Sequence, residues 1–166
     1  MGGREPIRTT LLILLSFLLF ESPTGSSLAG SPALTRPADP DPEVSVLVDL
    51  VNRRRSDLGC DPLTWHEGIA AVAAAYSLDM QQRDFYDHVD PDGESLIHRL
   101  TRAGIAFDGV AGENLAIGTV DGTIVYTLWI DSPEHRANIE NCAFTHHGVG
   151  LADGRWTHVF VQRPLH

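Results

Sequence analysis

The chain has 166 residues and a formal net charge of -10 at pH 7. Its length fits one domain plus a tail. Nucleic acids and acidic membrane surfaces both attract basic patches, so a chain this acidic is not expected to bind either of them.

The N-terminus has the pattern of a secretory signal peptide over residues 1–29. Arg4 and Arg8 precede the apolar run LLILLSFLLF at 11–20, and the small residues SLAG at 27–30 follow it. The apolar run is short for a bilayer span, which leaves an uncleaved anchor as the alternative. We therefore expect a secreted, extracellular protein with no transmembrane anchor after processing.

A linker and then a helix follow. Residues 30–42, GSPALTRPADPDP, are rich in Pro and small residues and predict an extended linker. The domain itself is expected to span 43–163. Apolar residues recur at helical spacing from Glu43 until Gly59, so the domain should open with a helix.

Two more helices are predicted in the next part of the chain. Thr64 with Glu67 predicts a capping box for an Ala-rich helix that runs to about Phe85. After a turn-rich loop, Ser95 should cap a short helix that Gly104 closes. The segment IAFDGVAGENLAIG that comes next is punctuated by Gly and is expected to be non-helical.

The rest of the chain predicts two helices and a hairpin. Residues 121–130 are expected to be helical, and Ser132 should be the N-cap of a helix through about Ile139, its oxygen directed to backbone amides. Asp153-Gly154 lies between the strand-like runs 146–152 and 155–162. Helices first and a hairpin last favour an α+β fold, with helices packed on a small antiparallel sheet.

The hairpin's second run should alternate between two faces. We expect Val159 and Val161 on one face and Trp156, His158 and Phe160 on the other.

The chain has two cysteines, Cys60 and Cys142. Outside the cytoplasm such a pair is expected to form a disulfide. That bond would join the first part of the domain to the last. Two buried free thiols are the alternative.

Common catalytic templates do not fit. HEGIA at 66–70 begins like a zinc-protease motif, but Ala70 stands where the second His is required. Ser132 precedes His135 by three positions, yet an N-capping hydroxyl is a poor nucleophile. We expect no catalytic residue. His88, Glu113 and His135 remain as polar residues in apolar or Gly-rich surroundings, where a lone His is usually a surface or core residue.

Four segments give these residues more weight. SLDMQQRDFYDHVDPDGES, GENLAIG, WIDSPEHRANI and HHGVGLA with WTHVFVQ occur in this order over roughly residues 44–162. The set resembles the signature blocks of the CAP superfamily (cysteine-rich secretory, antigen five and pathogenesis-related proteins), in particular its small secreted bacterial SCP-like branch. The resemblance implies an α-β-α sandwich, with helices on both faces of the sheet.

The resemblance also implies a site. His88, Glu113 and His135 match residues that line a central cleft in the family, and His88 and His135 with the carboxylate would suit Zn²⁺ with an open coordination position. The family's second acid falls at Ser132 in this chain. Asp131 and Glu134 are the neighbouring acids that could replace it.

The resemblance favours a secreted, monomeric binding protein over an enzyme. Its cleft would take a divalent cation, and its ligand would be lipid-like or a protein. Two alternatives stay open. One is a zinc-dependent hydrolase that uses a metal-activated water with Glu113 as the base. The other is a disulfide-stapled structural module of the cell envelope.

Overall fold

A computed structural model describes residues 41–165 of the protein. The predicted signal peptide and almost all of the predicted linker lie outside the described residues. Pro42, the last residue of that predicted linker, is the first residue of a helix. No helix within 41–165 is long and apolar enough to cross a membrane.

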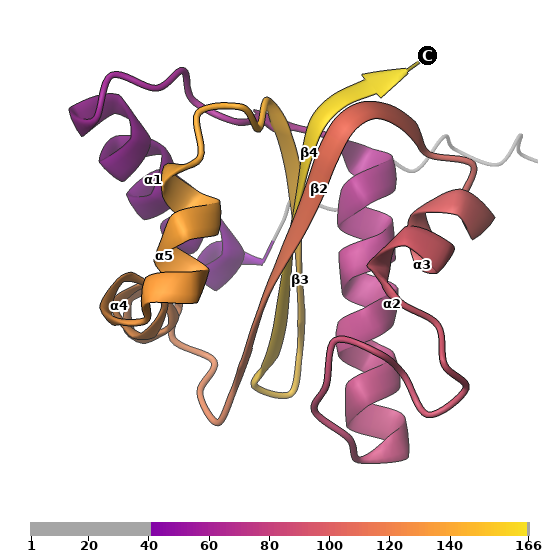
Figure 1. Ribbon diagram of the computed structural model, residues 1–166. Coiled ribbons are helices and arrows are strands. Elements are labelled where there is room, and N and C mark those ends of the chain that lie inside the picture. Colours follow the sequence, from indigo (N-terminus) through magenta and orange to yellow (C-terminus); the bar gives the residue numbers. More distant parts are fainter. Residues whose placement is uncertain (1–40, 166) are drawn as a thin grey trace, which may run out of the picture. The chain divides into compact units, whose positions relative to one another are not determined.

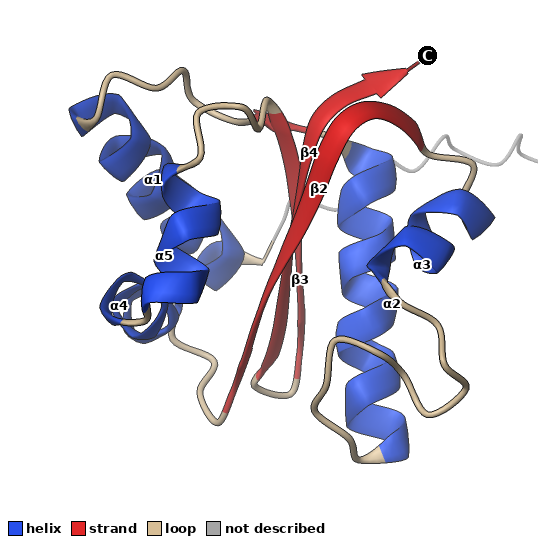
Figure 2. Ribbon diagram, viewed as in Figure 1, coloured by secondary structure: helices blue, strands red, loops and turns tan. Residues whose placement is uncertain are grey.

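Helices cover both faces of a small mixed sheet (Figures 1 and 2). Helices α1, α4 and α5 lie on one side of the sheet, and α2 and α3 lie on the other (Figure 1). The strands are ordered β1-β3-β4-β2, with β1 parallel to β3 and the other pairs antiparallel. This arrangement confirms the expected α+β, α-β-α sandwich. The elements in chain order are α1 Pro42–Asp57, β1 Thr64–Trp65, α2 Glu67–Arg83, α3 Leu96–Arg102, β2 Ala106–Ile117, α4 Gly122–Asp131, α5 Pro133–Glu140, β3 His146–Ala152 and β4 Arg155–Leu165.

The predicted hairpin is confirmed as β3 and β4, joined at Asp153-Gly154. Val159 and Val161 pack in the cluster beneath α2 and α3. Trp156 and Phe160 pack in the opposite cluster, with residues of α1 and α4. Because helices cover both faces of the sheet, both sets of β4 side chains are buried.

The segment predicted only as non-helical is the long strand β2. It pairs with β4 along nearly its whole length, with an irregularity between Asp108 and Ala111. Gly109 lies in that irregularity with φ +94°, a conformation that glycine adopts readily. The break in the strand and its glycines conceal the alternation that would have predicted it.

The predicted capping box of the second helix is wrong. Thr64 is in β1, paired with His146, so the chain is still extended at that point. His66 is the N-cap, and its Nδ1 accepts a hydrogen bond of 3.2 Å from the backbone N–H of Ile69. The helix ends at Arg83, two residues before the predicted Phe85, with Asp84 in the left-handed conformation.

Helix α2 lies unusually close to β3. A Cβ added at Gly148 would come within 2.1 Å of the backbone of Ala70, and one at Gly150 within 2.3 Å of the backbone of Ala74. Two glycines in one strand therefore let the helix backbone approach the sheet.

The predicted disulfide between Cys60 and Cys142 is confirmed. Beside it, the guanidinium of Arg55 is fully buried and donates hydrogen bonds to the carbonyls of Asp61, Ile139, Asn141 and Phe144. The end of α1 is thereby joined to the segment that connects α5 to β3.

Candidate functional site

Glu113 occupies the centre of the predicted site. It lies on β2 with 9% of its surface exposed. Its Oε1 is 2.8 Å from Nδ1 of His88, and its Oε2 is 2.6 Å from Nη2 of Arg99. The structure thus brings His88 and Glu113 together, and it engages both carboxylate oxygens.

Arg99 also holds the loop that carries His88. Its Nη1 donates to the carbonyls of His88 at 3.3 Å and of Glu94 at 3.0 Å. Its guanidinium carbon lies 3.3 Å from the centroid of the Tyr76 ring, a cation–π contact. The Tyr76 hydroxyl donates to the carbonyl of Asp87 at 2.6 Å. Side chains from α2 and α3 therefore fix the position of His88.

Sequence reasoning missed Arg99. The residue lies on the buried face of α3 between Leu96 and Leu100, and it is 5% exposed. A charged residue on the apolar stripe of a helix was the available signal, because buried charges require a partner.

His135 is supported by the residue that precedes its helix. Ser132 holds the N-cap position of α5 but makes no side-chain bond to the backbone, which corrects the predicted direction of its oxygen. Its Oγ lies 2.9 Å from Nδ1 of His135. His135 is the third residue of α5, the position from which a side chain in a capping box reaches back to the N-cap. The imidazole of His135 therefore forms a hydrogen bond with the Ser132 hydroxyl, in place of the usual bond from that hydroxyl to a backbone amide.

Two asparagines tie α5 to β2. Asn114, fully buried, donates from Nδ2 to the carbonyl of His135 at 2.9 Å. Asn138 donates to Oδ1 of Asn114 at 2.8 Å and to the carbonyl of Glu113 at 3.3 Å. These bonds fix the helix that carries His135 against the strand that carries Glu113.

The two histidines have opposite pKa shifts. The hydrogen bond with Glu113 raises the pKa of His88. Burial, and then the charge of His88, lower the pKa of His135. The two imidazoles are therefore close enough to influence each other, and a proton goes to His88 first.

Each of the two histidines has one ring nitrogen bonded to a neighbouring side chain. Nδ1 of each imidazole is engaged, which leaves Nε2 of His88 and of His135 as donors. Within residues 41–165, no three or more His, Cys, Asp or Glu side chains group so as to hold a metal ion. Zinc sites in proteins use three or four protein ligands, so two imidazole nitrogens alone supply fewer than either class.

The candidate replacements for the family's second acid, Asp131 and Glu134, are both exposed. Ser132 itself supports His135 as Glu113 supports His88.

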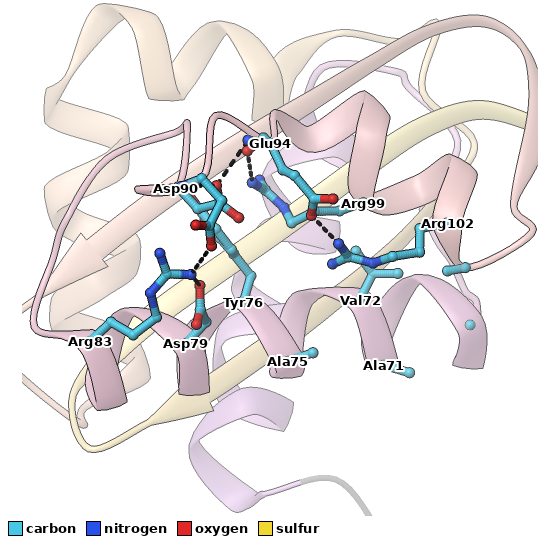
Figure 3. A pocket seen from close by; sticks show the side chains of 13 residues that line it. Ala71, Val72, Ala75, Tyr76, Asp79, Arg83, Asp90, Glu94, Arg99 and Arg102 are labelled. Atoms are coloured by element: carbon cyan, nitrogen blue, oxygen red, sulfur yellow. Dashed lines mark hydrogen bonds and ion pairs between the residues drawn. The ribbon is translucent and has the colours of Figure 1, made fainter.

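A groove of about 820 Å³ lies along α2, opposite the loop at 90–95 and α3 (Figure 3). Its lining includes Arg99 and Tyr76 but none of the three predicted site residues. Sequence reasoning did not identify it, since its walls come from separate elements.

The comparisons with known proteins identify the family. The model of the cysteine-rich secretory protein family, CAP, matches residues 48–163. The protein belongs to this family, as the resemblance of its motifs predicted.

Two curated proteins of Bacillus subtilis (strain 168) are similar to the chain. The uncharacterized protein YkwD is 36% identical over 119 residues, which cover 70% of this chain and 46% of that protein. The uncharacterized membrane protein YlbC is 35% identical over 117 residues, which cover 70% of this chain and 34% of that protein. The match spans less than half the length of either relative.

Solved structures share the fold. An extracellular protein containing a SCP domain from Bacillus anthracis str. Ames has a TM-score of 0.70 and 34% identity, over 73% of this chain and 40% of that one. An outer surface protein from Borrelia burgdorferi has a TM-score of 0.66 and 19% identity, over 75% of this chain and 96% of that one. The Borrelia likeness shows the fold alone.

Proposed function

We propose that this protein is an exported binding domain rather than an enzyme, and that His88 and His135 hold an exchangeable divalent cation such as Zn²⁺. The observation that carries the proposal is the bond between Nδ1 of His88 and Glu113. Carboxylates that bond the far nitrogen of a metal-binding histidine are a recurrent feature of metal sites, because they fix the tautomer and the ring orientation.

The chain's own residues prepare the two imidazoles. Glu113 orients His88, Ser132 orients His135, and Arg99 balances the charge of Glu113. A bound cation would offer its open positions to an oxygen or nitrogen atom of the ligand. Protonation of the histidines competes with the cation, so binding should weaken as the pH falls. Because the hydrogen bond with Glu113 raises the pKa of His88, that loss should begin at a higher pH than for an unperturbed histidine.

The hydrolase alternative needs Glu113 as a general base. A base requires an oxygen within reach of the water that it deprotonates. Both oxygens of Glu113 are engaged, by His88 and by Arg99, so the contacts favour a role in orienting His88. Turnover of an ester or peptide panel that needs added Zn²⁺ and stops on chelation would instead support the hydrolase.

Export is supported by the disulfide and by the relatives. Disulfides persist in oxidising compartments, and this domain carries one between Cys60 and Cys142. The matching Bacillus anthracis protein is described as extracellular, and the Borrelia protein as an outer surface protein.

Calorimetric titration with Zn²⁺ tests the proposal. His135→Ala should lose binding while its circular dichroism stays that of the parent. His98→Ala, a change of an exposed histidine of α3, is the matched control and should bind as the parent does. If His135→Ala binds Zn²⁺ as tightly as the parent, the cation proposal is wrong and the domain is better described as a structural module.

A further inference from the structure

The groove beside α2 lies between two walls (Figure 3). One wall is a single stripe of α2, and the other is the loop at 90–95 with α3. We name it the α2–α3 groove. Its lining residues are Gly68, Ala71, Val72, Ala75, Tyr76, Asp79, Arg83, Asp90, Asp92, Glu94, Arg99, Arg102 and Ala103.

Small side chains keep the α2 wall open. Gly68, Ala71 and Ala75 line it, and Ala71 and Ala75 are exposed. The stripe extends from Gly68 to Arg83, which corresponds to roughly 22 Å along a helix. An extended chain of roughly six or seven residues has that length.

Carboxylates outnumber the available cations in the groove. Asp79, Asp90, Asp92 and Glu94 line it, against the guanidiniums of Arg83, Arg99 and Arg102. Arg99 is already paired with Glu113, which is outside the lining. Four carboxylates therefore face two guanidiniums.

The pairing inside the groove engages one oxygen of each of the four carboxylates. Arg83 pairs with Asp92 at 2.7 Å and with Asp79 at 3.4 Å, and Arg102 pairs with Glu94. Asp90, 9% exposed, accepts the backbone N–H groups of Asp92 and Glu94. These backbone bonds lower the pKa of Asp90, so its carboxylate is charged at neutral pH. The excess negative charge favours a cationic ligand.

Other classes of ligand match this lining poorly. Tyr76 is 2% exposed with Arg99 over its ring, so the groove offers no open aromatic face on which a base could stack. Charged groups at both ends disfavour an acyl chain, because burying them without water is costly. The excess of carboxylates disfavours anions.

We infer that the α2–α3 groove binds a basic peptide segment of a protein partner in an extended conformation. The small side chains of the peptide would lie against Ala71 and Ala75. Its Lys or Arg side chains would reach Asp90, Asp92 and Glu94. The site is additional to the proposed cation site and does not depend on it.

Fluorescence anisotropy with end-labelled seven-residue peptides tests the inference. A peptide of alternating Lys and Ala should bind at least about tenfold more tightly than one of alternating Glu and Ala, a difference equivalent to about 1.4 kcal/mol. Ala75→Trp should fill the groove and weaken binding of the Lys peptide by a similar factor. Gln82→Trp, exposed on the same helix but outside the lining, should not.

A charge-matched pair of variants separates the groove from the net charge of the protein. Asp92→Asn with Glu94→Gln should weaken binding of the Lys peptide about tenfold. Asp49→Asn with Asp57→Asn removes the same charge from α1, on the other side of the sheet, and should leave binding unchanged.

Three results would overturn the inference: equal binding of the two peptides, equal losses in the two double variants, or displacement by spermidine as efficient as by the unlabelled Lys peptide. Calorimetry of Ala75→Trp with Zn²⁺ should match the parent. A loss of peptide binding to the groove is thereby distinguished from a loss of Zn²⁺ binding at the proposed cation site.

Discussion

The two histidines of the site are held in the same way by different partners. Nδ1 of His88 is bonded to a carboxylate on β2, and Nδ1 of His135 to the hydroxyl that precedes α5. In both cases the second nitrogen, Nε2, is left for a ligand. Ser132 thus stands where the family has an acid and supplies the oxygen that supports the second histidine.

Ser132→Ala should therefore act on cation binding more than on stability. Loss of a partner of this kind lowers metal affinity about 10- to 100-fold. Since Ser132 makes no side-chain cap bond, the stability loss should be smaller than the roughly 1 kcal/mol typical of a lost cap. Zn²⁺ calorimetry and urea unfolding of the same variant check both parts, and unchanged affinity with a full cap loss would contradict this role.

A second pair of histidines makes the fold sensitive to acid. His147 and His158 are fully buried, and Nδ1 of His147 lies 2.9 Å from Nε2 of His158. Burial lowers the pKa of His147 to about 4, and it lowers the pKa of His158 well below the ordinary histidine value. In the unfolded chain these histidines have an ordinary pKa of about 6.5, so below that pH the unfolded chain binds protons that the folded chain does not bind.

Stability should therefore be present above about pH 6.5 and be lost as the pH falls toward 4, by about 3 kcal/mol for His147 alone. The substitutions His147→Asn and His158→Gln replace both rings with amide groups, which can form a hydrogen bond with each other but do not titrate. Urea unfolding between pH 4 and 7 should give a flatter profile for His147→Asn with His158→Gln than for the parent. If the free energy of unfolding falls with pH equally in the variant and the parent, other groups cause the loss of stability in acid.

At the scale of elements, α2 packs so closely on β3 that no side chain fits between the two backbones at Gly148 and Gly150. Gly150→Ala would place a methyl group 2.3 Å from the backbone of Ala74. We expect a loss of about 3 kcal/mol or more, because the backbone of a packed helix cannot yield as a side chain can. Gly68→Ala is the control: the nearest atom to its added Cβ belongs to the His66 side chain, and its stability should change by less than about 1 kcal/mol. Equal effects in thermal unfolding would contradict the argument.

Helix α1 was predictable from the sequence because its buried apolar residues Val44, Leu47 and Val51 recur at helical spacing. The strand β2 was not. Its buried positions include the polar residues Glu113 and Asn114, whose side chains are hydrogen-bonded to neighbouring elements. Gly109 and Gly112 interrupt the pattern further. A strand with polar residues at buried positions therefore lacks the alternation by which strands are recognised.

At the scale of the whole molecule, the disulfide closes a segment of 82 positions. Chain-entropy reasoning gives a stabilisation of about 4.5 kcal/mol for such a loop. Cys60→Ser with Cys142→Ser should lower the free energy of unfolding by about that amount, and reductant should destabilise the parent alone. An effect under about 1 kcal/mol would mean that the neighbouring Arg55 contacts suffice to join these segments.

The members of the site were predictable only in part. His88, Glu113 and His135 followed from motifs that resemble a family, and the structure places His88 against Glu113. The contact of Ser132 with His135 lies within the first turn of α5 and was open to local reasoning. Arg99 carried a local signal too, but its partner Glu113 depends on how α3 packs against β2. The α2–α3 groove was unpredictable for the same reason.

The most direct test of the central claim is anomalous diffraction from crystals of the protein soaked in Zn²⁺. The account predicts one peak about 2.0–2.1 Å from Nε2 of both His88 and His135, with Glu113 still bonded to Nδ1 of His88. Absence of a peak between the two imidazoles, or a peak bound directly by Glu113 with the Arg99 pair broken, would contradict it.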